Sequence, residues 1–339
     1  MDAISTRRLS RLPDLYALAP EWRELWNRCP SATPFQCPEW LLPWIESFTP
    51  RELWVIEARY ENRLVGLAPM FIWQRAGEQV MAPVGAGITD YLDWLVDPAV
   101  GTECLPLLFQ NLGEAEWDTM ELMDLSQDSP LLQYRHHGGK QEPCAICPGL
   151  RFDPGTPFNK IVPSHQRRNL KTAENRMRRA GISRVELATR ETLPEFTAML
   201  INLHGSRWGE LGGPGVLEDP KVQEFHKRSS ARLLESDLLR FYGLRFDGRL
   251  IAVLHTLVGH NGMHCYLQGF DTAYSEFSPG MLLLERVVQD AAREGKSRVD
   301  FLRGRESYKY MWGAKDEQTY RIVVHKRALD SENHTRQAA

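Results

Sequence analysis

The residues with the clearest chemical potential form a charged cluster late in the chain. Residues 299–302 read VDFL, a core-like strand, and charged and aromatic side chains follow it at once, namely Arg303, Glu306, Tyr308 and Lys309. Charges at the end of such a strand are costly unless they are paired or used. Glu306 or Asp300 could take a proton from a reacting group, directly or through water. Arg303, Tyr308 and Lys309 could contact an anionic substrate or a developing oxyanion; a structural ion-pair network is the alternative.

A second candidate group precedes a leucine-rich segment that reads as a helix. Tyr266 could act as a general acid, and period-two alternation would place His264, Tyr266 and Gln268 on one face of a strand. Ser278, with proline after it, is a good helix N-cap, and the amides near Ser278 and Gly280 could hold a phosphate or carboxylate. We expect Gln268, Ser278 and Gly280 to bind the cofactor portion of a substrate. A plain sheet tyrosine and a plain helix start would explain the same residues.

Two predicted helices add further candidates. The segment 164–180 carries six cationic side chains and one acidic one. Such a run is usually a solvated face, although it could also bind an anionic partner. At the end of the next predicted helix, His204, Arg207 and Trp208 are candidates to line an acceptor cleft.

A last pair of candidates lies in the first half of the chain. Asp90 and Tyr91 begin a strand-like segment, 90–96, that stands where residues 266–271 stand in the second half. Carboxylates there could bind a cationic acceptor.

The bulk composition limits the classes of protein to consider. The chain has 339 residues, 42% hydrophobic and 25% charged, with a formal net charge of −3. This length suits two domains, and the charge gives no global attraction to nucleic acid or membrane. The first residues lack a signal-peptide core, and no stretch approaches the roughly 18 apolar residues of a membrane span. Together with six scattered cysteines, these features predict a cytoplasmic protein with reduced thiols and no metal.

An internal repeat indicates how the candidate residues are positioned. Residues 53–72 and 239–258 each read as strand, tight turn and strand, and each is followed by strand, helix and strand. A repeat of this length predicts a duplicated domain. We expect an α/β protein with two mixed, mostly antiparallel sheets flanked by helices. The expected domains are 1–150 and 151–330, joined through a Gly- and Pro-rich linker at 138–156, with a disordered tail at 331–339.

Several short motifs together carry a family resemblance over about residues 20 to 327. They are Thr33-Pro34-Phe35-Gln36 with Trp40 and Trp44, Gly66-Leu67-Ala68-Pro69, Asp90-Tyr91, Leu203-His204, Arg207-Trp208, Tyr266 to Asp271, Ser278-Pro279-Gly280, and Asp300 to Glu306 with Tyr308, Lys309, Trp312 and Gly313. On these residues the chain resembles the tandem-GNAT arrangement of the FemABX proteins. It resembles more closely the CelD/BioF-type acetyltransferase family, whose members are often associated with exopolysaccharide and cellulose gene clusters.

The resemblance implies an N-acyltransferase (EC 2.3.1) with its chemistry in the C-terminal half. The N-terminal half would be non-catalytic or would bind the acceptor. The donor would be an acyl-CoA or acyl-carrier-protein thioester, the acceptor an amine of a small molecule or sugar precursor, and Tyr266 the acid for the leaving thiolate. One departure is clear, because neither half has the Gln/Arg-x-x-Gly-x-Gly/Ala loop that holds the CoA pyrophosphate in simple GNAT enzymes. Residues 277–280, FSPG, stand in its place.

Two other functions remain open from the sequence. The first is a FemABX-like aminoacyltransferase that uses aminoacyl-tRNA, which the basic segment 164–180 would suit. The second is a non-enzymatic GNAT-fold protein that assists assembly of a polysaccharide synthase. An acyl carrier protein is the partner expected at the basic segment under the acyltransferase interpretation, and nucleic acid is the less favoured one.

Overall fold

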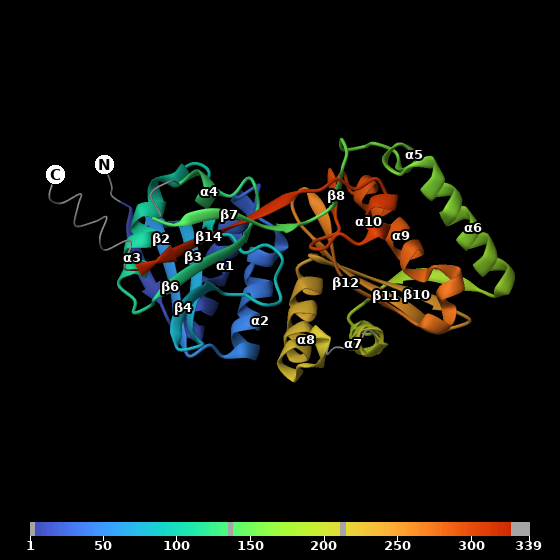
Figure 1. Cartoon of the computed structure of the whole chain (residues 1–339), viewed down its shortest axis with the longest axis horizontal. Coiled ribbons are helices and arrows are strands. Elements are labelled where there is room, and N and C mark those ends of the chain that lie inside the picture. Colours follow the sequence, from blue (N-terminus) through green and yellow to red (C-terminus); the bar gives the residue numbers. More distant parts are fainter. Residues whose placement is uncertain (1–3, 135–137, 211–214, 327–339) are drawn as a thin grey trace. The chain divides into compact units, whose positions relative to one another are not determined.

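The computed structural model describes residues 4–134, 138–210 and 215–326, with the side chains of 204–210 outside the description. The chain forms two compact units (Figure 1). The N-terminal unit comprises the chain up to Ala145 together with the part from Gln318 onward, and the C-terminal unit is Ile146–Glu317. Each unit has its own hydrophobic core. None of the described helices is both long and apolar enough to cross a membrane.

The N-terminal unit is built on an eight-stranded sheet. Seven strands run in the order β1-β2-β3-β4-β6-β14-β7, and β5 pairs with β3. Its strands are β1 (Ser5–Leu9), β2 (Glu52–Tyr60), β3 (Arg63–Arg75), β4 (Glu78–Pro83), β5 (Leu95–Val96), β6 (Thr119–Leu125), β7 (Lys140–Ile146) and β14 (Gln318–His325). Its helices are α1 (Leu12–Arg28), η1 (Pro34–Gln36), α2 (Pro38–Phe48), η2 (Gly101–Cys104), α3 (Leu105–Gly113) and α4 (Pro130–Gln133).

The C-terminal unit is built on a six-stranded sheet in the order β8-β13-β12-β11-β10-β9. Its strands are β8 (Gly149–Arg151), β9 (Ser183–Leu187), β10 (Leu239–Phe246), β11 (Arg249–Val258), β12 (Gly262–Phe270) and β13 (Arg298–Asp300). Its helices are α5 (Phe158–Ile161), α6 (Ser164–Ala180), α7 (Leu193–Glu210), η3 (Val216–Glu218), α8 (Pro220–Glu235), η4 (Thr272–Phe277), α9 (Pro279–Arg293) and α10 (Ser307–Met311).

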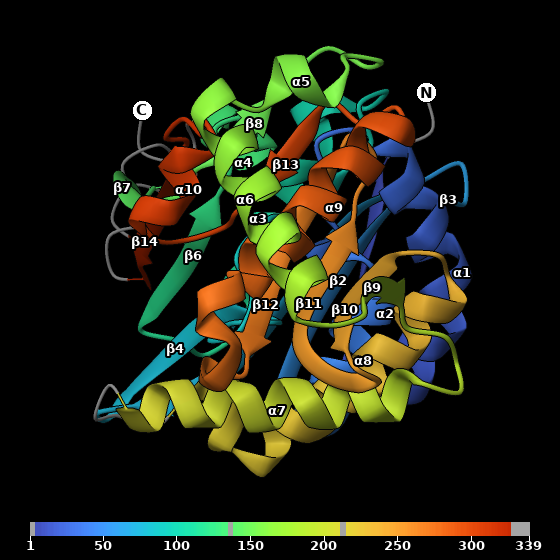
Figure 2. The same ribbon diagram turned by 90° about the vertical axis from the view of Figure 1, so that its right-hand side faces the viewer.

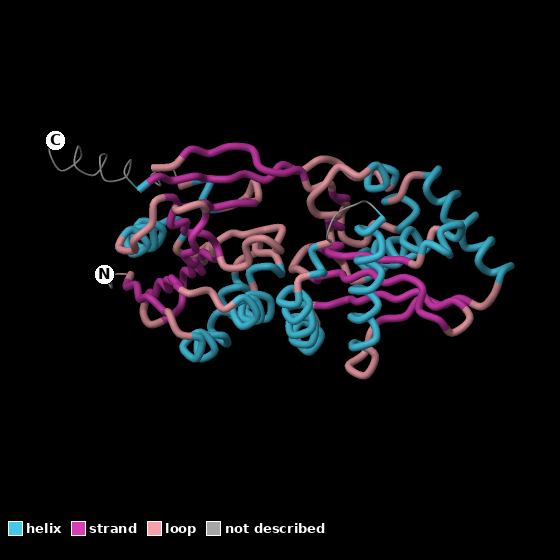
Figure 3. The backbone as a smooth tube through the Cα atoms, turned by 60° about the horizontal axis from the view of Figure 1, so that its bottom comes forward, coloured by secondary structure: helices cyan, strands magenta, loops and turns pink. Residues whose placement is uncertain are grey.

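Helices cover both faces of this second sheet. Side chains of α6 and α9 form one core with inward residues of β10, β11 and β12. Helices α7 and α8 lie on the other face, where α7 contacts β11 and β12 (Figures 1 and 2). Figure 3 shows the same layering by secondary structure. The sheet therefore separates an α9 side from an α7–α8 side.

The predicted hairpin repeat is present in detail. In β2–β3 the pairing closes at Tyr60 and Arg63, and its register shifts at Arg59. In β10–β11 the register shifts at Arg245, which follows Arg59 by 186 positions, and the pairing closes equivalently. Each arginine is ion-paired with a helix, Arg59 with Glu21 of α1 and Arg245 with Glu195 of α7. A shared bulge and a shared ion pair support duplication of one domain.

One predicted equivalence between the halves is wrong. Strand β4 pairs antiparallel with β3 and parallel with β6, just as β12 pairs with β11 and β13. The counterpart of β12 is therefore β4, and not the segment that begins with Asp90 and Tyr91. The strand predicted over 90–96 is reduced to β5. Residues 84–88 form turns that include Gly85 and Gly87 at positive φ, and residues 89–94 form no helix or strand.

The ends of the units also differ from the predicted domains. Strand β14 lies within the predicted second domain, 151–330, yet it pairs with β6 in the first sheet. The predicted linker contains β7 and β8, which belong to different sheets. Gly139 precedes β7, and a Cβ there would lie 2.7 Å from side-chain atoms of Ile322 and Val324. A close approach to β14 thus explains a glycine that suggested a flexible linker. The predicted tail at 331–339 lies outside the described residues.

Candidate active site

Strands β12 and β13 part from each other in the middle of the second sheet. Their parallel pairing joins Gly262, Met263 and His264 to residues 298–300 and stops there. Strand β13 ends at Asp300, whereas β12 continues to Phe270. Along the described chain, residues 265–270 therefore have a neighbouring strand only on the β11 side. An opening between two parallel strands is a place where the main chain of β12 can meet a ligand.

Tyr266 forms a β-bulge at the start of this opening. In the β11–β12 register, Thr256 pairs with Cys265 and His255 pairs with Leu267, so the register skips Tyr266. A bulge takes main-chain groups out of the ladder and redirects the side chains that follow. The bulge thus takes Tyr266 out of the β11–β12 ladder where β12 and β13 separate.

The bulge corrects the prediction that Tyr266 and Gln268 share a face. The ring of Tyr266 lies 5.6 Å, between centroids, from that of His226 in α8. The Oε1 atom of Gln268 instead lies on the α9 side, 3.5 Å from the position that a Cβ on Gly280 would take. Simple alternation fails because the extra residue shifts the phase of the strand. The side chains of Tyr266 and Gln268 therefore lie on opposite faces of the sheet at the opening.

Tyr266 lies against a buried polar cluster. His255 and Ser230 are buried, with 3.0 Å between Nε2 of His255 and Oγ of Ser230. Burial lowers the pKa of His255 to about 3, so this imidazole is neutral at physiological pH. The Tyr266 ring lies 5.8 Å from that of His255. The tyrosine thus lies over uncharged groups, and His255 has a packing role.

The N-terminus of α9 borders the opening on the other side. Ser278 occupies the N-cap position with φ of 52°, in the left-handed region, and its side chain makes no capping hydrogen bond. The expected side-chain cap is therefore absent at this residue, because the unusual backbone conformation directs the hydroxyl elsewhere. The Ser278 carbonyl accepts bonds from the amides of Met281 and Leu282. Pro279 has no N–H, so Gly280 carries the first amide of the helix.

Gln268 presents an unused acceptor to the same place. Its Oε1 atom is buried and has no hydrogen-bond partner among the described residues. A buried acceptor without a partner costs free energy, on the order of 1–3 kcal/mol, unless a ligand or water supplies the donor. Gln268, Ser278 and Gly280 are thus gathered in one place, as the prediction that they act together requires.

Asp300 is held in an ion-pair network at the point where β13 ends. Its side chain is fully buried, and it accepts from Arg298 at 2.6 Å and from the Leu302 amide at 2.8 Å. Burial alone would raise its pKa, but the charge of Arg298 and the contact with His264 outweigh burial and hold it at about 2. Arg298 also pairs with Glu317. Such a carboxylate is a weak base at neutral pH, so we assign Asp300 to positioning.

Lys309 is also occupied by the chain itself. Only 2% of its side chain is exposed, and Nζ donates to the carbonyls of Leu302, Arg303 and Gly304 at 2.8–3.0 Å. Leu302 and Gly304 have positive φ values of 58° and 108°. Because one ammonium holds three convergent carbonyls, Lys309 fixes this tight loop. Its predicted contact with substrate becomes a role in positioning the loop.

The other predicted residues of the cluster surround this loop. Glu306 is the N-cap residue of α10, is 53% exposed, and lies 2.9 Å from the ammonium of Lys309. Arg303 is exposed, and Tyr308 is half-buried against the core of the unit. The structure therefore gathers Asp300, Glu306 and Lys309 through the loop that follows β13.

Other predicted residues lie outside this group. His204, Arg207 and Trp208 belong to α7, and their side chains lie outside the described part of the structure. Asp90 and Tyr91 are buried in the N-terminal unit, where the Tyr91 ring lies 6.3 Å from that of Phe35. They are part of a loop of that unit.

One residue at the opening was not assigned a role from the sequence. His264 directly precedes the point where β12 and β13 part, and its Nδ1 lies 3.5 Å from Oδ2 of Asp300. Strand periodicity indicated its face, but the sequence has no signal for the parallel pairing that brings Asp300 opposite it.

Comparisons with known proteins match this geometry. Residues 164–310, which include the opening, the α9 terminus and the loop after β13, match the model of the acetyltransferase (GNAT) domain. The matched segment lies within the C-terminal unit. No curated protein sequence matches the chain.

Solved structures resemble the chain over both units. FemX is 11% identical with a TM-score of 0.68, covering 96% of this chain and 98% of that chain. The C-terminal domain of a putative lysylphosphatidylglycerol synthetase from Agrobacterium fabrum is 12% identical with a TM-score of 0.58, covering 93% and 94%. L-PGS from Bacillus licheniformis is 10% identical with a TM-score of 0.57, covering 89% and 90%. At these identities the likeness is one of fold. The prediction of a FemABX-like tandem fold with a GNAT domain is confirmed.

Proposed function

We propose that the protein is an N-acyltransferase that moves an acyl group from a thioester donor to an amine of a small molecule or sugar precursor. The observation that carries the proposal is the opening between β12 and β13, with its bulge at Tyr266, inside the segment that matches the GNAT domain. We include a role in exopolysaccharide synthesis in this proposal on the family resemblance alone.

The donor is proposed to enter from the α9 side. The Gly280 amide and the positive end of the α9 dipole favour an anionic or carbonyl group there. The unused acceptor of Gln268 suits an amide N–H of the pantetheine arm, which acyl-CoA and acyl carrier protein share. Main-chain N–H groups of β12 at the bulge would then stabilise the oxyanion that forms on the thioester carbonyl.

The acceptor is proposed to approach from the α7–α8 side, where Tyr266 lies. Its neutral amine attacks the thioester carbonyl, a C–N bond forms, and the C–S bond breaks. Tyr266 gives a proton to the departing thiolate, and the proton of the attacking nitrogen passes to a base. The side chains proposed to contact the acceptor are those of Arg303, Tyr308, His204, Arg207 and Trp208. The bases predicted from the sequence are Glu306 and Asp300. In the structure both carboxylates are committed to cations of the chain, Lys309 and Arg298.

Release of free thiol tests this function. Purified protein is incubated with acetyl-CoA, a long-chain acyl-CoA or an acyl carrier thioester, each with a panel of amines, and thiol is quantified. We expect amine-dependent release with at least one donor, and native mass spectrometry of the purified protein should detect CoA or carrier as a bound species. Absence of thiol release with all three donor classes would reject the proposal.

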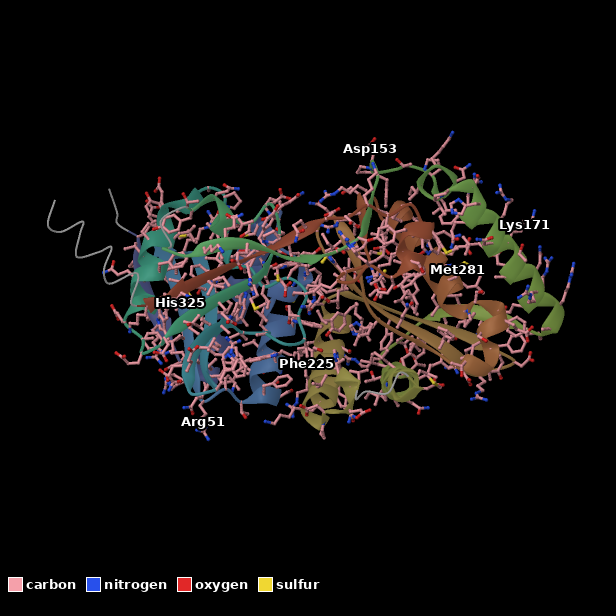
Figure 4. The ribbon with its side chains drawn as sticks, in the orientation of Figure 1. Arg51, Asp153, Lys171, Phe225, Met281 and His325 are labelled. Carbon is pink, nitrogen blue, oxygen red and sulfur yellow. The ribbon has the colours of Figure 1, made fainter. Side chains whose placement is uncertain are left out.

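A tRNA-dependent aminoacyltransferase is the second candidate. The FemX fold over both units and the exposed cations of α6 favour it, and Figure 4 shows Lys171 on the outward side of that helix. Arg168, Lys171 and Arg179 are exposed. Binding of bulk tRNA is measured across a salt series, with the three cations changed to Gln as the comparison. A steep salt slope that the triple variant flattens would favour this candidate over the acyl-thioester donor.

A further inference from the structure

The pair formed by His264 and Asp300 has a geometry that the predicted roles of the cluster leave unexplained. The two residues face each other where the β12–β13 pairing ends, on the side of the sheet opposite Met263 and Val299, which pack in the α9 core. They therefore lie on the α7–α8 side, which Tyr266 also faces. Both lie at the mouth of the opening, one step before the bulge.

We propose that His264 is the general base that accepts the proton of the attacking amine, with Asp300 as its positioning residue. This inference rests on the proposed acyl transfer and assigns the base for that reaction. The amine nitrogen forms its bond to the acyl carbon and releases its proton to Nε2 of His264. Asp300 stays ionised throughout and stabilises the imidazolium that results.

The contacts of Asp300 fix how the imidazole is used. Its carboxylate is held by Arg298 and by the Leu302 amide, so it cannot turn away from the ring. Nδ1 of the ring is buried 3.5 Å from Oδ2 of this carboxylate, which is longer than a formed hydrogen bond. Catalytic hydrogen bonds are often long in unliganded structures and shorten in the complex. An acceptor at Nδ1 favours the tautomer with the proton on Nδ1, which leaves the lone pair on Nε2.

Exposure favours the histidine over the carboxylate as the group that meets substrate. The side chain of Asp300 is fully buried, whereas 6% of the His264 side chain is exposed. Glu306 is exposed, but it begins α10 and pairs with Lys309, which itself holds the loop. His255, the other strand histidine among the described residues of the C-terminal unit, is fully buried and donates to or accepts from Ser230. His264 is thus the imidazole at the opening that a carboxylate orients.

The tautomer of His264 tests this inference without any turnover. In full-length protein labelled with 15N-histidine, the His264 ring is assigned by comparison with the His264→Gln variant. We expect Nδ1 to be protonated and Nε2 unprotonated near pH 8, and Asp300→Asn to shift the ring toward the other tautomer. A wild-type ring protonated on Nε2 would overturn the inference.

Steady-state kinetics tests the role of the base directly. His264→Gln is expected to lower kcat by about 10²- to 10⁴-fold, with KM for the acyl donor within about threefold. His325→Gln, an exposed histidine at the end of β14 in the N-terminal unit, is the matched control and should leave kcat unchanged. Equal turnover of wild type and His264→Gln would reject His264 as the general base and would leave the proposed acyl transfer standing. Absence of turnover in the wild type with every donor would instead reject the proposed function, and the tautomer would still report on the pair.

Discussion

Nδ1 of His264 and Oδ2 of Asp300 lie 3.5 Å apart at the point where the paired part of β12 and β13 ends. Beyond this contact the two strands separate, and the next but one residue of β12, Tyr266, forms a bulge. A buried ionised carboxylate, an imidazole and a redirected tyrosine are therefore set at one opening by strand pairing alone. The predictions below test the parts of the structure that hold this arrangement.

Lys309 is expected to stabilise the loop that follows β13. Changing Lys309 to Met keeps its length but leaves the carbonyls of residues 302–304 without their donor. We expect a loss of about 2–4 kcal/mol in the free energy of unfolding, because buried acceptors lose their partners. Urea unfolding measures it, with Lys315→Met, an exposed site, as control. A loss below about 0.5 kcal/mol would show that the ammonium does not hold the loop.

Asp300 should make the protein acid-sensitive in a defined range. Its pKa in the folded protein is about 2, below the ordinary value of 3.8. A lowered carboxyl pKa adds stability above pH 3.8, and this contribution disappears as the pH falls from about 4 to 2. It amounts to about 2 kcal/mol. Unfolding free energies of wild type and Asp300→Asn should converge across this range, and a constant difference between them would contradict the assignment.

His255 should produce a second pH dependence at higher pH. Its pKa falls from 6.5 to about 3 on folding, because burial disfavours the imidazolium. The unfolded chain then binds more protons between these values, so stability is complete above pH 6.5 and declines below it. His255→Gln should reduce the slope of stability against pH between 3 and 6.5. An unchanged slope, measured by thermal unfolding in matched buffers, would show that His255 is not the group responsible.

Gly139 should be needed for the return of β14 to the first sheet. Gly139→Ala places a Cβ 2.7 Å from side-chain atoms of Ile322 and Val324. We expect destabilisation by about 1–3 kcal/mol from overpacking. Gly113→Ala is the control, because a Cβ at that helix residue meets nothing within 4 Å and should be neutral or stabilising. Equal stability of the two variants would contradict the close packing of Gly139 on β14.

Sequence patterns predicted much of this fold because the signals were local. Helix α6 has the predicted bounds, 164–180. The hairpins were visible through their turn residues. Helix α8 was not predicted. Its start does carry a local signal, because Asp219 caps the helix and Pro220 begins it.

The parts that sequence could not predict depend on pairing between distant segments. The bulge at Tyr266 arises from a register shift against β11, which no local pattern encodes. The pairing of β14 with β6 joins residues that lie far apart in the chain. The same holds for the site, where Asp300 and Lys309 were identified as important but were expected to act on substrate. Their partners, Arg298 and three main-chain carbonyls, depend on how the loop closes.

Backbone hydrogen exchange with and without a bound donor shows whether the opening between β12 and β13 binds the donor. A non-hydrolysable thioether analogue of acetyl-CoA is added to the full-length protein, and exchange is followed by mass spectrometry across all peptides. We expect slower exchange in the peptides that contain 265–270 and 278–282, which border the opening between β12 and β13. Saturable binding of the analogue with protection confined to other segments would contradict it.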